Sequence, residues 1–456
     1  MHRIAGPVVA AAVLACVLCC PLPLGADEAG GKSQITNHKS QIAERLDRSI
    51  ASAARYMVRK QSADGAWRSK TYGCFKDGPS LTGLVLSAMF FMPQGGPAVM
   101  KQSYRRGAGY LVQMVGPDGS IRAGENGLLF PVLSAASASR VVVLLEKTPK
   151  NLAAQQAWLK FLRAYQLNGS LGWSPSDPEF GGWGFSLKPP RKPKPGELRE
   201  AFAESNVVAT IFGIAALRSA KVPADDPVWK DVLTFVERCQ NYTDDSVILS
   251  AAKNPGPEKQ ILRSAQNDEA REAGDPKFDD GGFFFIPTDP LQNKAGVAGT
   301  DKLGRTRFHS YGSMTADGLR ALIRCGLPVD HPRVVAARKW LQRNFSVDHV
   351  PGVYEPDHEV LRDATYYYWC WSVAHAFGEL QIGPGTPKWA ETLAEELIKR
   401  QRPDGSWTNR FTDAKEDDPL VATAWAAAAL AICREVIAGE IKELVPRRGA
   451  AAHPGR

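Results

Sequence analysis

The chain has 456 residues, 44% of them hydrophobic and 23% charged, which is the composition of a globular protein with a large core. This balance excludes disorder as the default state. The formal net charge is +8, but Lys and Arg are spread along the chain among acidic neighbours. They form no basic stripe interleaved with aromatic residues, so we expect no nucleic-acid partner.

Residues 1–26 are predicted to be an export signal. Arg3 supplies the positive charge, residues 4–18 form a short apolar stretch, and Leu24-Gly-Ala26 offers a small-residue cleavage site. The apolar stretch is too short for a membrane span. A second interpretation stays open, because residues 13–16 resemble a bacterial lipobox that would leave Cys16 lipidated at a membrane surface. Either way, we expect an exported protein of the periplasm or cell envelope.

Several stretches look peripheral to any core. A duplicated Lys-Ser-Gln-Ile motif predicts a low-complexity linker over residues 27–44. The Pro- and Lys-rich residues 188–196 are typical of a surface loop, and residues 247–274 carry an internal duplication of their own. Residues 439–456 are predicted to be a flexible tail.

The sequence predicts no metal site and no cofactor. The eight His residues are scattered, with no His-x-x-x-His pair on one helix face. Five cysteines lie beyond the leader, without a Cys-x-x-Cys pair, and their odd number leaves at least one unpaired. A phosphate loop and a Gly-x-Ser-x-Gly motif are also absent from the sequence.

Residues 45–438 repeat one pattern, a helix, an Asp-Gly turn and a second helix. Two copies are clear, with turns at Gln61-Ser-Ala-Asp-Gly-Ala-Trp67 and Gln401-Arg-Pro-Asp-Gly-Ser-Trp407. Four blurred copies lie between them, at residues 110–121, 157–173, 232–240 rejoined at 279–283, and 336–353. The steps from Trp67 to Ile121 to Trp173 are 54 and 52 residues, and the insertions at 188–196 and 247–274 lengthen other copies. Six helical hairpins are therefore predicted.

These hairpins are predicted to close into a ring. An open solenoid would expose the apolar faces of its terminal repeats unless polar caps cover them. Residues 421–431, in the last repeat, are apolar almost all round, which indicates burial on both sides. Closure accounts for this burial if the second helix of each hairpin lies inside and the first lies outside. The fold class is thus all-α.

The turns at residues 61–67 and 401–407 resemble the glutamine-tryptophan repeat of squalene and oxidosqualene cyclases, shared more loosely with prenyltransferase beta subunits. The resemblance covers roughly residues 44–438. It implies an α/α toroid with a central, partly apolar cavity that could take an isoprenoid or other apolar small molecule. In the turn, Asp-Gly reverses the chain, the Trp packs over it, and the Gln amide bonds exposed backbone of neighbouring helices.

The catalytic signatures of these families are not reproduced. The cyclase motif Asp-x-Asp-Asp-Thr-Ala has its nearest match at Glu416-Asp417-Asp418, which Pro follows. The prenyltransferase zinc pattern would need Cys where Thr365 stands, two residues after Asp363, so no zinc is expected. If the chain is a cyclase, the acid that protonates the substrate would be Asp418, Asp417 or Asp363.

Two segments of the inner helices offer candidate cavity-lining residues. The aromatic run at residues 366–371 includes Tyr367 and Trp371, and His375 follows four residues later on the same helix face. The fourth inner helix opens with three polar candidates, which are His309, Tyr311 and Asp317. Some of these side chains are expected to line the cavity, although packing between the helix layers is the alternative for each.

A Thr recurs in four inner helices, with a residue of helix-capping type five positions earlier. The pairs are Asp77 and Thr82, Ser205 and Thr210, Ser310 and Thr315, and Asp418 and Thr423. We expect the earlier residues to cap the helices. Parallel inner helices would also gather their positive ends at one mouth of the ring, where they favour an anionic group.

Three functions remain open from the sequence. The first is a terpenoid cyclase or prenyltransferase-like toroid that acts on an isoprenoid. The second is a non-catalytic toroid that binds a lipid, glycan or peptide, or an interaction module of the cell envelope. The third is a toroid that acts on polysaccharide, with inner aromatic residues as sugar platforms. The sequence does not fix the oligomeric state.

Overall fold

The computed structural model describes residues 27–92, 98–123, 127–243, 277–302, 304–381 and 388–439. The chain divides into residues 1–42 and residues 43–456, and the second unit holds all the hairpins. The predicted leader, the insertion at 247–274 and the tail beyond Gly439 lie outside the described residues. The insertion lies there in full, since no residue from 244 to 276 is described. Helix α1 begins at Asp27, so the stretch expected as a linker is helical.

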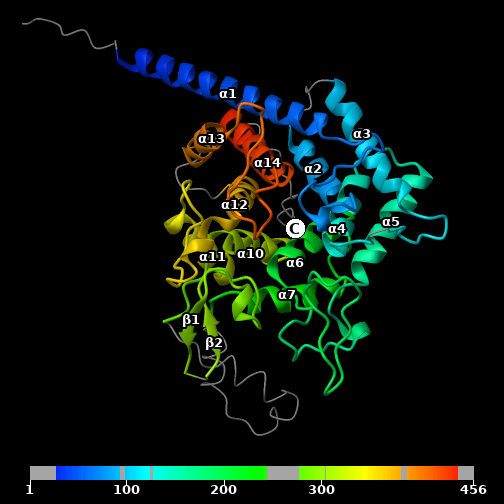
Figure 1. Ribbon diagram of the computed structural model, residues 1–456. Helices are drawn as coiled ribbons and strands as arrows, with labels where there is room; N and C mark the ends of the chain where they lie inside the picture. The colour runs from blue at the N-terminus through cyan, green and yellow to red at the C-terminus, as the bar shows by residue number, and fades with distance from the viewer. Residues whose placement is uncertain are drawn as a thin grey trace, which may run out of the picture. The chain divides into compact units, whose positions relative to one another are not determined.

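Within the described residues, six inner helices form a closed ring. They are α2 (Pro79–Phe91), α4 (Pro131–Val142), α6 (Val207–Ser219), α10 (Gly312–Arg324), α12 (Tyr366–Leu380) and α14 (Pro419–Ala438). Each packs against the next, and α14 packs against α2 (Figure 1). The structure therefore confirms the predicted α/α toroid.

The first helix of each hairpin lies in an outer layer. These helices are α3 (Ala98–Gln113), α5 (Pro149–Arg163), α7 (Val228–Arg238), α11 (Pro332–Asn344), α13 (Lys388–Arg400) and, from residue 43 on, α1 (Asp27–Arg59). They pack on the inner layer, as α5 does on α4, α11 on α10 and α13 on α14. Outer helices such as α7 bury one apolar stripe, whereas α2, α6 and α14 bury nearly their whole surface.

Local sequence explains where several helices begin. Pro occupies the first position of α2, α4, α5, α11 and α14, where its missing N–H costs nothing and its fixed φ suits a helix. Among the described helices, α14 is long and apolar enough to cross a membrane by composition, but most of it is buried in the protein. The apolar surface of α14 therefore packs against other parts of the protein.

The connections between helices contain little regular structure. A two-stranded antiparallel sheet pairs β1 (Val297–Thr300) with β2 (Thr306–Phe308), which the sequence analysis did not predict. Short 3-10 helices are η1 (Gly73–Phe75), η2 (Gly169–Leu171), η4 (Pro290–Gln292) and η5 (Glu359–Thr365). Residues 188–196 form a loop. The five described cysteines are unpaired.

The repeat turn has the same hydrogen bonds in both clear copies. The Gln401 amide donates to the carbonyl of Gly405 in its own turn and to the carbonyl of Ser49 in α1, each at 3.0 Å. Gln61 does the same with Gly65 and with Ser103 in α3. The Gln therefore ties each turn to the outer helix of the next hairpin. Because Ser49 belongs to the first hairpin, the Gln401 bond also joins the last hairpin to the first.

The Trp of the turn binds both layers of its own hairpin. The Trp407 indole N–H donates to the Leu397 carbonyl of α13 at 2.8 Å, and its backbone N–H donates to Thr423 Oγ1 of α14 at 3.0 Å. Thr82, Thr210 and Thr315 accept the equivalent backbone bond in three other hairpins. The recurring Thr thus fixes the turn against its inner helix.

The structure corrects two assignments within these repeats. The turn Trp of the third hairpin is Trp183, which bonds to Leu162 and Thr210, and not Trp173, because residues 168–180 are inserted between Gln166 and the turn. Of the four expected caps, only Asp418 is a side-chain N-cap. Asn206 caps α6 in place of Ser205, which donates to the Glu179 carbonyl.

Candidate functional site

Two of the three predicted catalytic acids lie where the ring closes. Asp418 caps α14 by accepting the Leu420 N–H at 2.8 Å, and its other oxygen accepts the hydroxyl of Ser69 from the first hairpin. Asp417 accepts the hydroxyl of Tyr72, also from the first hairpin, at 2.5 Å. Both carboxylates therefore connect the last hairpin to the first.

Asp363 also binds backbone near the start of an inner helix. It lies in η5, and its carboxylate accepts the Val350 N–H at 3.2 Å. The neighbouring acid Glu416 accepts the N–H groups of Tyr367 and Tyr368 at 2.9 and 2.8 Å, at the positive end of α12. The positive ends of α12 and α14, expected to attract an anionic ligand, are thus occupied by acids of the chain itself.

The centre of the ring holds an aromatic cluster, which we define as Phe212, Tyr368, Trp371, Trp425 and His375. The Trp371 ring lies 4.7 Å from that of Trp425 and 4.8 Å from that of His375, between centroids. Phe212 of α6 lies 5.9 Å from Trp371 and 6.2 Å from Trp425. Since α6 is adjacent to neither α12 nor α14 in the ring, these contacts cross its interior.

Asp317 of α10 is fully buried beside this cluster. Its carboxylate accepts the Tyr368 hydroxyl at 2.5 Å and the Ser372 hydroxyl, and it pairs with Arg320 at 3.1 Å. The Arg320 guanidinium in turn lies over the Trp371 ring, 4.8 Å from its centroid. Burial raises the pKa of Asp317 against the lowering effect of Arg320. Compared with Asp363, Asp417 and Asp418, Asp317 is therefore the carboxyl that contacts the aromatic cluster.

A second group of buried polar and charged side chains lies toward the C-terminal ends of the inner helices. His375 Nδ1 lies 2.9 Å from Glu379 Oε1, and Arg324 reaches the same carboxylate at 2.5 and 2.7 Å. Burial, followed by the charge of Arg320, lowers the pKa of His375 to about 3. Burial alone would raise the pKa of Glu379, but Arg324, His375 and Arg320 hold it well below its usual range. His375 is therefore neutral and Glu379 ionised at physiological pH.

The six predicted cavity-lining residues do not all lie in the ring interior. The structure brings Asp317, Trp371 and His375 together there, as described above. Tyr311 precedes α10 and packs its ring against Tyr354, 6.1 Å away between centroids. Tyr367 instead directs its hydroxyl to the Thr408 carbonyl of the last turn, at 3.4 Å.

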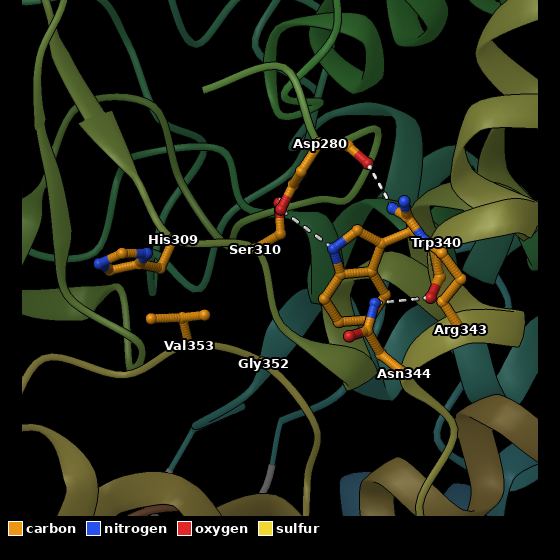
Figure 2. Close-up of a pocket in the computed structure, with 8 residues that line it drawn as sticks. All are labelled: Asp280, His309, Ser310, Trp340, Arg343, Asn344, Gly352 and Val353. Atoms are coloured by element: carbon orange, nitrogen blue, oxygen red, sulfur yellow. Dashed lines mark hydrogen bonds between the residues drawn. The ribbon is translucent and has the colours of Figure 1, made fainter. Parts of the chain in front are cut away.

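The sixth, His309, lines a groove at the rim, beside the start of α10. The groove encloses about 370 Å³ between the turn before α10 and the end of α11 (Figure 2). Its lining comprises Asp280, His309, Ser310, Trp340, Arg343, Asn344, Gly352 and Val353. Asp280 accepts hydrogen bonds from Ser310 Oγ at 2.7 Å and from the Trp340 indole at 3.0 Å. Burial lowers the pKa of His309, which favours its neutral form.

One group of potential metal ligands occurs among the described residues. Glu355, Asp357 and His358 offer ligand atoms within 4.8 Å of one another. The Glu355 carboxylate already accepts the Val297 N–H at 2.9 Å, and His358 Nδ1 lies 3.1 Å from the Lys294 carbonyl. We assign no metal to this half-exposed group.

Sequence reasoning missed most of the charged residues in the ring. Arg320, Arg324 and Glu379 were not selected, although charged residues within inner helices of a closed ring must find buried partners. Their spacing was the available signal. Arg320 stands three residues after Asp317 and four before Arg324, and Glu379 stands four after His375, so each set shares a helix face.

Comparison with known proteins supports the fold. No protein-family model matches the sequence, and no curated protein matches it either. The structure is similar to that of the type II terpene cyclase MstE from Scytonema. A variant of MstE bound to its substrate, geranylgeranyl dihydroxybenzoate, aligns with TM-score 0.50 and 10% identity over 87% of this chain and 99% of the enzyme. A variant bound to the product, merosterolic acid A, aligns with TM-score 0.50 and 11% identity over the same shares. The chain thus has a squalene-cyclase-like toroid fold.

Proposed function

We propose that this protein binds a small apolar ligand inside the ring, against the aromatic cluster. The position of Trp425 is the observation that carries this proposal. Its ring contacts Tyr368 and Trp371 of the adjacent α12 and, across the interior, Phe212 of α6, yet it keeps partial solvent exposure. A side chain that is surrounded by other rings and still accessible marks interior space that a ligand can enter.

An apolar approach to this interior supports the proposal. Phe75 lies in η1 before α2, Phe130 is the N-cap residue of α4, and Phe185 follows the turn that Trp183 joins to α6. The Phe130 ring contacts those of Phe75 and Phe185, at 5.5 and 5.8 Å between centroids. Phe130 and Phe185 are partly exposed. Exposed apolar side chains that gather at the mouth of a ring favour entry of an apolar molecule.

An isoprenoid is the ligand class we favour. Stacked and edge-on aromatic faces suit an unsaturated hydrocarbon chain, and they stabilise positive charge that develops on it. The similar toroid MstE has been solved with a geranylgeranyl-bearing substrate, which supports this choice.

Native mass spectrometry of protein purified from its host tests ligand binding. We expect wild-type protein to retain an apolar molecule, and Trp425→Leu to reduce its occupancy at least about tenfold through lost contact area. Trp173→Leu is the matched control, because Trp173 is buried in a separate cluster with Leu167 and Phe180. Wild-type protein without a ligand, or equal loss in both variants, would contradict the proposal.

A second candidate function is acid-initiated cyclisation of the bound isoprenoid with Asp317 as the acid. Its support is the buried carboxyl with a raised pKa beside Trp371 and Tyr368. Incubation with squalene and shorter isoprenoids should then give a cyclised product, which Asp317→Asn abolishes and Asp418→Asn preserves in folded protein. Loss of product only in Asp418→Asn would return the role to Asp418.

We further propose that the protein is exported and cleaved after Ala26. The charged start, the short apolar stretch and the small residues before Asp27 support this. Intact-mass analysis of the protein from its host is expected to show a chain that begins at Asp27. A lipid-modified chain that begins at Cys16 would instead establish the lipoprotein alternative.

A further inference from the structure

A group of basic side chains lies at the C-terminal ends of the inner helices, away from the mouth that is lined by Phe130 and Phe185. Arg140 stands in the last turn of α4, and Arg324 ends α10. Arg320 lies one turn before Arg324, and only 3% of its surface is exposed. Among the described residues, these three guanidiniums interact with two carboxyls, those of Asp317 and Glu379, so positive charges outnumber negative ones here. Arg218, in the last turn of α6, adds a further guanidinium, which donates to the Arg324 carbonyl.

Arg140 carries this excess charge. It is partly exposed, and among the residues that the structure describes it has no hydrogen bond or ion pair. Nevertheless its pKa falls to about 10, first because of burial and then because of repulsion by Arg324 and Arg320. The Arg140 guanidinium is thus partly covered by the protein and lies within electrostatic reach of Arg320 and Arg324.

Unpartnered buried atoms surround the same place. Within the described part of the chain, Arg320 Nε is buried without a hydrogen-bond acceptor, and so is the hydroxyl of Tyr104, which lies within electrostatic reach of Arg140. His375 Nε2 is also buried without a partner. Because Nδ1 of His375 donates to the ionised Glu379, Nε2 carries a lone pair and requires a donor. Buried donors without acceptors destabilise the folded protein, so a bound acceptor would stabilise this arrangement.

Neutralisation of the helix ends does not explain this group. Arg140 and Arg324 are placed to interact with the negative ends of α4 and α10, as basic residues in a last turn commonly do. Arg320 stands a full turn earlier, and its charge is directed at Asp317 and the Trp371 ring. The helix ends therefore do not supply an acceptor for the buried Nε of Arg320 or for the Arg140 guanidinium.

We propose that Arg140 and Arg320 bind a small carboxylate anion in the ring, at the C-terminal ends of the inner helices. A carboxylate is planar and bears a single charge, so it can use the open fork of Arg140 while it neutralises the excess positive charge. A hydroxyl on the ligand, or a water molecule, would supply the donor that His375 Nε2 lacks. This site adjoins the aromatic cluster through His375 and Arg320, but its support does not depend on the proposed function.

Calorimetry and thermal unfolding of the full mature chain test this site, with sodium acetate and sodium lactate against sodium chloride at equal ionic strength. We expect both carboxylates to bind and to raise the Tm of wild-type protein more than chloride does. Lactate should bind more tightly than acetate, because its hydroxyl can donate to His375 Nε2. Arg140→Gln should weaken acetate binding at least about tenfold. Arg105→Gln, an exposed residue of α3, is the matched control and should behave as wild type.

The stability of Arg140→Gln without a carboxylate distinguishes ligand binding from a structural role. We expect this variant to be at least as stable as wild type in chloride alone, because it removes repulsion among the guanidiniums. Should it be poorly folded, Arg140→Lys keeps the charge and should lose the preference for carboxylate over chloride. Equal responses of wild-type protein to acetate and chloride, or equal acetate binding by wild type and Arg140→Gln, would overturn the site. Lactate binding no tighter than acetate would remove only the role of His375.

Discussion

At the residue scale, the environment of each carboxyl determines its role. Asp417, Asp418 and Asp363 were candidate acids because they are the nearest matches to the catalytic motifs of the similar families. The structure uses them as hydrogen-bond acceptors for Tyr72, Ser69 and the Val350 N–H. Asp317 faces the ring centre instead. Sequence spacing places residues on a helix face, but it does not say which face turns inward, so it could not distinguish these carboxyls.

The buried carboxyl of Asp77 allows the effect of burying a charge on stability to be measured. It is nearly buried beside α2, and burial raises its pKa to about 6, despite the hydrogen bond that it accepts from the Leu129 N–H at 3.2 Å. The folded protein therefore holds this proton more tightly than the unfolded chain. The resulting stability is fully present below about pH 4 and is lost as the pH rises through about 6.

Asp77→Asn is expected to raise the free energy of unfolding at pH 8 by about 1–3 kcal/mol, because it removes a buried charge. At pH 5 this advantage should fall by about half. Urea unfolding at both pH values measures it. Asp225→Asn, at an exposed position, is the control and should change little. A variant that is less stable than wild type at pH 8 would show that the Asp77 charge is favourable.

At the element scale, the repeat turn was the most predictable feature. The pairs Gln61 with Trp67 and Gln401 with Trp407 identified the hairpins and their bonding roles from the sequence alone. The third hairpin was misassigned, because the insertion at residues 168–180 moves Trp183 away from Gln166. The spacing of the repeats favoured Trp173, because spacing does not show which Trp donates a hydrogen bond to the outer helix.

The turn glycines give a matched prediction. Gly405 and Gly119 occupy equivalent turns with φ of +90° and +77°. A Cβ on Gly405 would lie 2.5 Å from the Ser52 carbonyl oxygen of α1, whereas one on Gly119 would meet nothing within 4 Å. Gly119→Ala should therefore cost about 1 kcal/mol for the backbone alone, and Gly405→Ala about 3 kcal/mol or more. Chemical denaturation measures both values. Equal costs would show that α1 does not approach the last turn this closely.

At the scale of the whole molecule, the sequence predicted the closed ring but not what fills it. Closure followed from the apolar surface of the last inner helix, and the structure forms it through α14 and α2. The contacts of Phe212 with Trp371 and Trp425 join helices that are not adjacent in the ring. A repeat pattern describes neighbouring hairpins, so it contains no information about contacts across the ring. The pairing of Arg320 with Asp317, in contrast, lies within one helix and was visible in their spacing of three residues.

Ring closure predicts a specific pattern of stability. In an open array the terminal hairpins have one neighbour each and unfold first, whereas every hairpin of a ring has two. The first and last hairpins are further joined by Ser69 with Asp418, by Ser49 with Gln401, and by Asp47 with Arg434 at 2.7 Å. Loss of one such contact should therefore loosen both terminal hairpins together.

Hydrogen exchange followed by mass spectrometry measures this directly. The amides of α2 and α14 are predicted to be as protected as those of α6 and α10, and Ser69→Ala should speed exchange in α2 and α14 together while α6 remains unchanged. If α2 or α14 of the wild-type protein exchanges well before the other inner helices, or if Ser69→Ala affects only α2, the hairpins do not form a closed ring.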